Sequence, residues 1–185
     1  MGEYVTRSVI VADERVDCMY LTFRAVELAL SQSPEEAIQV ALERRFRSRG
    51  LLRDGKVVNY EDRFEYGEDM VFSGKWGREI TQTLGRTERI KGSRGRDNVE
   101  VLPAEVLVRN RDRLRNGDLL FFVKRPEKRI REEIVGHIGI VKVDGEVHLI
   151  HAAGTKGKGG EVRKVMLKEY LKTMPFIGVM VTRFD

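Results

Sequence analysis

Val16-Asp17-Cys18-Met19-Tyr20-Leu21-Thr22-Phe23 is the stretch that decides the fold, because it places the chain's only cysteine at the start of an apolar helix. Asp17 is a favourable N-cap residue, and apolar positions up to Leu30 predict a helix that ends within residues 31–34. Cys18 then lies on the first turn, where unpaired N–H groups and the helix dipole favour thiolate, the nucleophilic form. The same N–H groups could hold an oxyanion. The alternative is that Cys18 is a small core residue.

Length and composition predict one soluble globular domain over residues 1–185, with 41% hydrophobic content. A single cysteine excludes an internal disulfide and a zinc cluster of several thiolates, and we expect no metal and no cofactor. No run approaches the roughly 20 apolar residues of a membrane span. Met1-Gly2-Glu3-Tyr4 lacks the basic and apolar regions of a signal peptide. We therefore expect a cytoplasmic protein, or an exported one if a leader has been removed. The sequence does not indicate an oligomeric state.

Basic residues exceed acidic ones by 34 to 29, which gives a formal net charge of +5. This mixed, dense charge is typical of a solvated, ion-paired surface. Local basic clusters at residues 44–49, 91–96 and 109–115 could meet an anionic partner. Most such clusters are solvated faces, and the motif criteria for nucleic-acid binding do not favour a nucleic acid as the partner.

A second helix is predicted directly after the first. Ser33 is a good N-cap, Pro34 fits the first helical position and Glu36 completes a capping box. Its apolar positions share one face, and Gly50 is the expected stop. Asp54-Gly55 then separates two short extended runs, which predicts a hairpin.

Residues 61–96 are irregular, and we interpret them as a long, partly ordered excursion. Side chains on such segments often line a substrate groove, so Arg63, Tyr66 and Trp76 are candidate substrate-binding residues. The alternative is that these aromatic residues anchor the segment to the core. Two further candidates are Asp17 beside the cysteine and Tyr4, whose hydroxyl could assist an oxyanion.

The C-terminal half predicts most of the strands. Apolar runs and turn signals predict a short helix at 103–114, a central strand ending at Val123, a hairpin of 135–143 with 146–152, a strand at 161–166, a short helix at 167–172 and a last strand at 176–181. All three histidines lie on the hairpin. The base that a catalytic cysteine needs must therefore come from this hairpin.

The length of the hairpin turn decides which histidines share a face. A two-residue turn at Asp144-Gly145 would join Val143 to Glu146 and put His137 and His151 on opposite faces. A three-residue loop at 143–145, with glycine in the left-handed position, joins Lys142 to Glu146 instead. It brings His137 directly opposite His151, at about 5 Å.

Side-chain segregation favours the three-residue loop. It groups apolar residues on the face of His137 and His151, and it leaves three polar residues on the other face, namely Lys142, Glu146 and His148. His137 is then the candidate base for Cys18, and His151 would hold His137 in the useful tautomer. Gly136 and Gly139 would leave room for a helix end or a substrate backbone.

Two non-catalytic alternatives remain for these residues. The histidines could be structural, or they could bind a metal together with a carboxylate such as Asp118. Cys18, His137 and His151 could also bind zinc, although their spacing matches no common zinc signature.

Four motifs in order resemble the NlpC-type cysteine peptidase superfamily: Asp17-Cys18, Gly117-Asp118, His137-Ile138-Gly139-Ile140 and Ile150-His151-Ala152. Within it, the chain is most similar to the N-acetylmuramoyl-L-alanine amidase-like family, formerly of unknown function. The segments that carry this similarity are Arg53-Asp54-Gly55, Asp62-Arg63-Phe64-Glu65-Tyr66, Asn116-Gly117-Asp118, Leu149-Ile150-His151-Ala152 and Gly178-Val179 before Arg183.

The resemblance implies a papain-like α+β fold, with the cysteine helix and the second helix packed on a small antiparallel sheet. It also implies Cys18 as nucleophile, His137 as base and His151 as orienting residue in a cysteine peptidase or amidase. The implied substrates are amide bonds of peptidoglycan stem peptides, of the lactyl-alanine junction, or of related γ-linked or isopeptide compounds. Two alternatives stay open: a thioester acyltransferase on the same fold, and a basic module that binds an anionic partner without catalysis.

Overall fold

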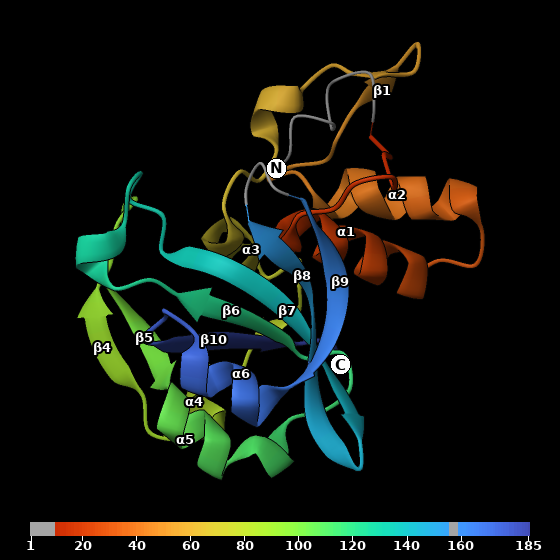
Figure 1. The fold of residues 1–185 in the computed structure, drawn as a ribbon. Helices are drawn as coiled ribbons and strands as arrows, with labels where there is room; N and C mark the ends of the chain where they lie inside the picture. Colours follow the sequence, from red (N-terminus) through yellow and green to blue (C-terminus); the bar gives the residue numbers. More distant parts are fainter. Residues whose placement is uncertain (1–9, 156–158) are drawn as a thin grey trace. The chain divides into compact units, whose positions relative to one another are not determined.

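The computed structural model describes residues 10–155 and 159–185, so the predicted site residue Tyr4 lies outside the described residues. The chain divides into two compact units, Met1–Glu65 and Tyr66–Asp185 (Figure 1). Helices are combined with an antiparallel sheet, which confirms the α+β class. A single papain-like domain over residues 1–185 stays a prediction.

The first unit begins with the two predicted helices. Helix α1 spans Cys18–Ala29, and the Asp17 Oδ1 atom accepts a hydrogen bond of 2.7 Å from the Tyr20 N–H, which confirms the N-cap. Helix α2 spans Pro34–Arg44.

The capping box of α2 forms only in part. The Ser33 hydroxyl oxygen accepts from the Glu36 N–H at 3.1 Å, but the Glu36 carboxylate reaches back to the Gln32 N–H instead of that of Ser33. The helix also ends earlier than Gly50, because Phe46 leaves it to form an isolated β-bridge with Arg63. A contact distant in sequence therefore decides this helix end.

A short hairpin follows, as predicted. Strands β1 (Leu52–Arg53) and β2 (Lys56–Val57) pair antiparallel around Asp54 and Gly55. Both turn residues have positive φ, at 50° and 72°, which matches the Asx-Gly preference of tight hairpin turns. A 3-10 turn, η1 (Tyr60–Asp62), lies close to the end of this unit.

The second unit is built on an antiparallel sheet. This sheet is larger than the small one that the sequence predicts. The described residues form eight strands in the order β4-β5-β10-β6-β7-β8-β9, with β3 paired to β10 (Figure 1). The strands are β3 (Arg78–Glu79), β4 (Glu88–Lys91), β5 (Asn98–Pro103), β6 (Leu119–Val123), β7 (Val135–Asp144), β8 (Glu146–Thr155), β9 (Gly159–Met166) and β10 (Gly178–Arg183).

Strand β6 lies at the centre of the core, because all five of its residues are buried. Successive side chains of a strand point to opposite faces, so full burial means that both faces are covered. Leu120 and Phe122 join an apolar cluster with α4 (Thr81–Leu84), α5 (Ala104–Arg109) and α6 (Leu167–Thr173). In Figure 1 these three helices lie along the same side of the sheet.

Helix α3 (Gly67–Ser73) packs on the opposite face of this sheet. A Cβ atom at Gly67 would lie 2.6 Å from the Val135 side chain, so only glycine permits this approach. The buried Glu68 carboxylate accepts hydrogen bonds from the Ile134 and Val135 N–H groups, at 3.0 and 3.1 Å. These bonds hold α3 to the start of β7.

Residues 61–96 are therefore more ordered than the sequence predicts. They contain the end of η1 and all of α3, β3, α4 and β4, and each of these elements is seven residues or shorter. Elements of this length show no long periodic pattern, and they form here because distant strands and side chains complete their hydrogen bonds. Two more 3-10 turns, η2 (Arg111–Arg113) and η3 (Pro126–Lys128), complete the described elements. None of the described helices is long and apolar enough to cross a membrane.

Candidate functional site

The hairpin of β7 and β8 brings His137 and His151 to one face, but with a different pairing from the predicted one. Val143 pairs with Val147, so the turn is centred on Gly145, one residue later than expected. Moving the centre of a turn by one residue shifts the pairing by two, which preserves the faces. The two histidines are therefore diagonal neighbours, and the prediction that they lie directly opposite each other is wrong.

The two imidazole rings form a hydrogen-bonded pair. The His137 Nε2 and His151 Nδ1 atoms are 2.9 Å apart, and the ring planes are nearly perpendicular, at 89°. If His151 Nδ1 accepts this bond, His137 carries its proton on Nε2 and presents an unprotonated Nδ1. This is the tautomer in which His137 can accept a proton from another group.

Aromatic side chains surround the pair. Phe122 lies on β6 beside His137, with ring centroids 5.9 Å apart, and Tyr170 of α6 meets the His151 ring edge-on at 4.9 Å. The Phe176 ring is parallel to that of His137 within 6°. Burial, and to a lesser degree the charge of His151, lowers the pKa of His137 to about 4. Burial and then the charge of Arg163 lower the pKa of His151. Both rings are thus held in the neutral form near pH 7.

Sequence reasoning missed these aromatic residues. Tyr170 and Phe176 lie 19 and 25 residues after His151, and nothing in the sequence indicates that they meet the histidine hairpin. The only feature of the sequence that pointed to one of these aromatic residues was the apolar run of β6, which contains Phe122.

The glycines beside His137 do not leave the open space that the sequence predicts. A Cβ atom at Gly136 would lie 2.5 Å from the Phe176 ring, and one at Gly139 would lie 2.4 Å from the Leu149 side chain. The protein's own side chains fill both positions. Gly136 instead accompanies a β-bulge between β6 and β7, where pairing shifts from Phe122 with His137 to Val123 with Val135.

Cys18 is the first residue of α1 in the first unit, and it is partly exposed. Its carbonyl oxygen accepts a hydrogen bond from the Thr22 hydroxyl at 2.8 Å. The N–H groups of Tyr20 and Leu21 both bond to Asp17, through its side chain and its carbonyl oxygen. The predicted position of the thiol at a capped helix N-terminus is therefore confirmed.

Charged side chains hold the segment before α1 against that helix. Arg24 contacts both carboxylate oxygens of Asp13, at 2.8 and 3.0 Å, and also Glu27. The fully buried Glu27 in turn binds Arg45 of the α2 C-cap by two hydrogen bonds, of 2.5 and 2.7 Å. The Tyr20 hydroxyl accepts from the Ala12 N–H at 2.6 Å. This network orders the chain on the approach to Cys18.

The candidate substrate-binding residues have partners within their own units. Asp17 serves as the N-cap of α1. Arg63 forms an ion pair of 2.8 Å with Glu65, and its guanidinium lies over the Tyr60 ring. The Arg94 guanidinium lies 3.6 Å from the centroid of the Tyr66 ring. Their roles toward a substrate stay predictions.

Trp76 is fully buried in the second unit, and its carbonyl oxygen accepts a hydrogen bond of 2.6 Å from the Thr182 hydroxyl. A ring with no exposed surface offers nothing to a substrate in this structure. Its placement corresponds to the alternative in which the aromatic residues of 61–96 anchor the segment.

The metal alternatives gain no support from the described residues. Asp118 is fully buried, and both of its carboxylate oxygens bind Arg183 at 2.7 Å. Within residues 10–155 and 159–185, no group of three or more histidine, cysteine, aspartate or glutamate side chains is arranged to hold a metal ion.

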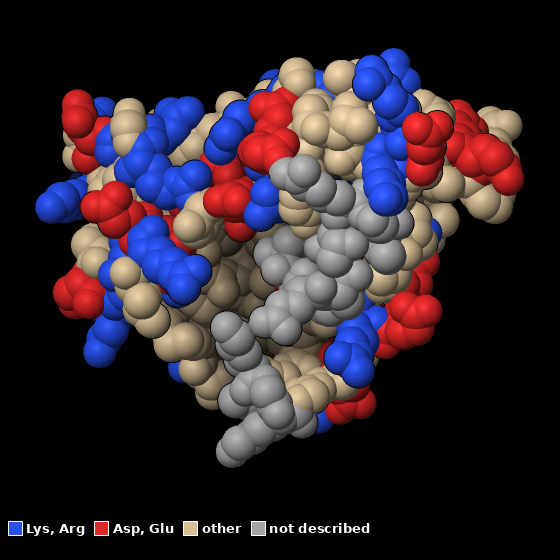
Figure 2. All heavy atoms as spheres, turned by 90° about the horizontal axis from the view of Figure 1, so that it is seen from above, with Lys and Arg blue, Asp and Glu red and all other residues tan. Residues whose placement is uncertain are grey.

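Three arginines of the clusters at 44–49 and 91–96 contact other side chains of the protein. Arg45 is buried against Glu27, Arg94 contacts Asp69, and Arg96 lies over the Phe72 ring. On the face shown in Figure 2, basic and acidic side chains are interspersed. The basic residues there do not form a continuous surface of one sign, as a binding module for an anionic polymer would need.

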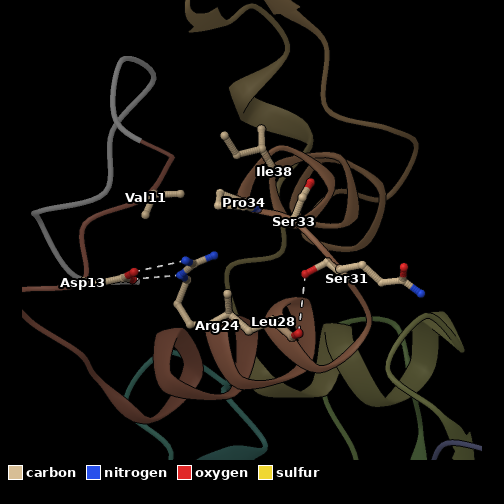
Figure 3. A pocket seen from close by; sticks show the side chains of 9 residues that line it. Val11, Asp13, Arg24, Leu28, Ser31, Ser33, Pro34 and Ile38 are labelled. Atoms are coloured by element: carbon tan, nitrogen blue, oxygen red, sulfur yellow. Dashed lines mark hydrogen bonds and ion pairs between the residues drawn. The ribbon is translucent and has the colours of Figure 1, made fainter.

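A pocket of about 520 Å³ lies within the first unit (Figure 3). Apolar side chains of Val11, Leu28 and Ile38 line it together with the ion pair of Asp13 and Arg24. None of the predicted site residues lines this pocket, so it is separate from the predicted chemistry.

Comparisons with known proteins place the fold. The sequence matches no model of a known protein family and none of the curated proteins. Among solved structures, the chain is similar to an N-acetylmuramoyl-L-alanine amidase from Bacteroides uniformis ATCC 8492, with a TM-score of 0.68 and 22% identity over 96% of this chain and 87% of that one.

Two further structures share the fold. A Bacteroides fragilis protein provisionally named a xylanase gives a TM-score of 0.69 at 22% identity, over 95% of this chain and 90% of that one. A DUF1460 protein from Legionella pneumophila str. Philadelphia 1 gives a TM-score of 0.62 at 16% identity, over 89% of this chain and 74% of that one. The chain thus has the α+β fold of these proteins, and their differing names show that the fold alone does not define an activity.

Proposed function

We propose that this protein is a cysteine-dependent hydrolase of amide bonds in peptidoglycan fragments, with Cys18 as nucleophile, His137 as base and His151 as orienting residue. The observation that carries the proposal is the hydrogen bond of 2.9 Å between His137 and His151, which leaves Nδ1 of His137 to accept a proton when His151 Nδ1 is the acceptor of the bond. The thiol at the capped start of α1 is the second element. The fold shared with a protein named N-acetylmuramoyl-L-alanine amidase supports a peptidoglycan substrate.

The proposed reaction has two halves. His137 Nδ1 takes the proton of the Cys18 thiol, the sulfur attacks the amide carbonyl, and the imidazolium gives its proton to the leaving amine. Water then attacks the thioester with His137 again as base, which releases the acid and restores the thiol. His151 keeps its bond to Nε2 throughout and so fixes the tautomer of His137.

Burial keeps His137 unprotonated near pH 7, as a base must be, but by lowering the pKa it also weakens the affinity of the ring for a proton. A thiolate beside the ring would oppose the effect of burial on the pKa of His137. The thiol with neutral imidazole and the thiolate with imidazolium carry the same number of protons, so both give the same pH dependence of reactivity. That reactive form should exist well below the usual thiol pKa of about 8.5.

The test is the rate of Cys18 alkylation by iodoacetamide from about pH 5 to about pH 10, which is specific because the chain has one cysteine. We expect a plateau that begins well below pH 8.5 in the parent. In His137→Ala the rate should rise only near the ordinary thiol pKa, so that it is about 100-fold lower near pH 6.5. His148→Ala is the matched control, because His148 lies on the opposite face of the hairpin and should keep the parent profile.

A thiol that stays inert until the protein unfolds would make Cys18 a core residue and would overturn the proposal. Salt-dependent binding to an anionic polymer would then favour the basic binding module. If the thiol is reactive, peptidoglycan fragments should be cleaved by the parent and at least about 1,000-fold more slowly by Cys18→Ala. Transfer of the acyl group to an added amine in preference to water would identify an acyltransferase instead.

A further inference from the structure

Arg163 lies beside the histidine pair on the neighbouring strand. It is on β9, the last strand in the order of the sheet, and it pairs directly with His151 of β8. Directly opposed residues of antiparallel strands share a face, with Cβ atoms about 5 Å apart. Arg163 is therefore on the same face as His151.

The two residues differ strongly in exposure. His151 is 6% exposed, whereas the Arg163 side chain is 58% exposed. The Arg163 guanidinium contacts Oε1 of Glu161 on the same strand, at 2.7 Å from Nε and 2.5 Å from Nη2, and Glu161 is 62% exposed. An accessible cation, held by an accessible carboxylate, thus adjoins a buried imidazole.

The charge of Arg163 also acts on the His151 ring. After burial, it is the next cause that lowers the pKa of His151. A cation that affects the ring of His151 can also attract an anionic group bound next to that ring.

We propose that Arg163 binds a substrate carboxylate next to the scissile amide. The inference rests on the proposed function, because it assumes that the amide is cleaved at Cys18 and His137. Arginine pairs with carboxylates through several N–H donors, and in the substrate-free protein Glu161 contacts Arg163 at Nε and Nη2. Exposed ion pairs contribute little to stability, so a substrate carboxylate can replace Glu161 at low cost.

This site narrows the substrate class. An extended chain spans about 3.5 Å per residue, so a carboxylate close to the amide along the substrate is the kind of group that a side chain beside His151 could bind. A substrate with a carboxamide at that position would lose the interaction.

The experiment compares two alkylating reagents of Cys18 that differ in charge, namely anionic iodoacetate and neutral iodoacetamide. The ratio of their rates, iodoacetate over iodoacetamide, is measured at low salt in the parent and in Arg163→Ala. We expect the ratio to fall about threefold in Arg163→Ala, and the difference to shrink at high salt. Arg163→Lys should keep most of the parent ratio, and Glu161→Gln should raise it.

Arg89→Ala is the matched control. Arg89 lies on β4 at the other end of the strand order, is 72% exposed and forms a similar ion pair with Glu100 at 3.1 Å. Its loss changes the net charge of the protein equally and should leave the ratio unchanged. An equal fall in Arg89→Ala and Arg163→Ala would overturn the inference, because the effect would then follow net charge alone.

Two other outcomes separate this inference from the proposed function. If Cys18 reacts with both reagents below pH 8.5 but the ratio is the same in the parent and Arg163→Ala, the carboxylate site is wrong and the proposed function survives. If Cys18 reacts with neither reagent until the protein unfolds, the proposed function fails and the inference fails with it.

Discussion

The two units bury polar pairs in different ways. In the first unit, Glu27 and Arg45 are 0% and 1% exposed and carry opposite charges, joined by two hydrogen bonds. In the second unit, His137 and His151 are two bases joined by one hydrogen bond among aromatic rings. Opposite charges can compensate each other in a poorly solvated interior, whereas two bases cannot. The first pair is a buried salt bridge, whereas burial lowers the pKa of both histidines and holds the second pair neutral.

This difference separates a structural pair from a chemical one. The Glu27 and Arg45 pair fastens α1 to the end of α2, and protons take no part in its function. The histidine pair is uncharged near pH 7, and in this neutral state His137 retains an unprotonated ring nitrogen. Burial thus keeps a nitrogen of His137 unprotonated near pH 7, and a negative charge close to the ring would be needed to raise its affinity for a proton.

The largest effect is expected from breaking the ionised pair. Glu27→Gln leaves the buried Arg45 without a counter-charge, and it should lower the free energy of unfolding by about 3–5 kcal/mol. Urea unfolding measures this loss, and hydrogen exchange should show it in the amides of α1 and α2. A free energy of unfolding equal to that of the parent would contradict the comparison.

An exposed pair provides the control for this prediction. Arg49 and Glu43 are 3.7 Å apart, with side chains 57% and 58% exposed. Glu43→Gln should change the free energy of unfolding by less than about 1 kcal/mol, because solvent already stabilises both charges. Replacing Glu27 and Arg45 together by apolar residues of similar volume should recover much of the loss.

The next effect concerns pH and the neutral pair. The pKa of His137 is lowered to about 4 in the folded protein, against about 6.5 when unfolded. Between pH 4 and pH 6.5 the unfolded chain binds more protons at this histidine than the folded protein does. The free energy of unfolding is therefore highest above about pH 6.5 and decreases as the pH falls toward 4. The total contribution is roughly 3 kcal/mol.

Urea unfolding at several pH values tests this dependence. In His137→Gln the decrease between pH 6.5 and 4 should be much smaller than in the parent. His148→Gln retains the hydrogen-bonded pair of His137 and His151 and should keep the parent's decrease. Parallel pH curves for the parent and His137→Gln would show that burial does not keep this histidine neutral.

The smallest effect is expected at the partly exposed N-cap. Asp17→Ala removes the acceptor for the Tyr20 N–H and should lower the free energy of unfolding by about 1 kcal/mol, whereas Asp17→Asn should keep most of the cap. The two variants also test the predicted substrate role of Asp17. If Asp17→Asn folds normally but raises the KM for a peptidoglycan fragment, the charge of Asp17 contributes to binding as well as to the helix.

Local features were predictable because their causes lie within a few residues. The start of α1 follows from Asp17 and the start of α2 from Ser33, since each cap bonds an N–H group three residues later. The shared face of His137 and His151 follows from the two-residue period of strands. The exact pairing of the two strands could not be predicted, because the side-chain pattern defines only which residues share a face. The centre of the turn could move by one residue without changing those faces.

The sequence by itself determined the two helix starts, the buried central strand, the order of the chemical motifs and the position of the thiol on the first turn of α1. The tertiary structure alone decided the early end of α2, the ordering of residues 66–96, the diagonal contact of the histidines and the aromatic surroundings that set their pKa values. The physical reason is range. Caps, turns and strand periodicity depend on neighbours in the chain, whereas burial and the partners of a buried group depend on residues that meet only when the sheet and its helices have packed.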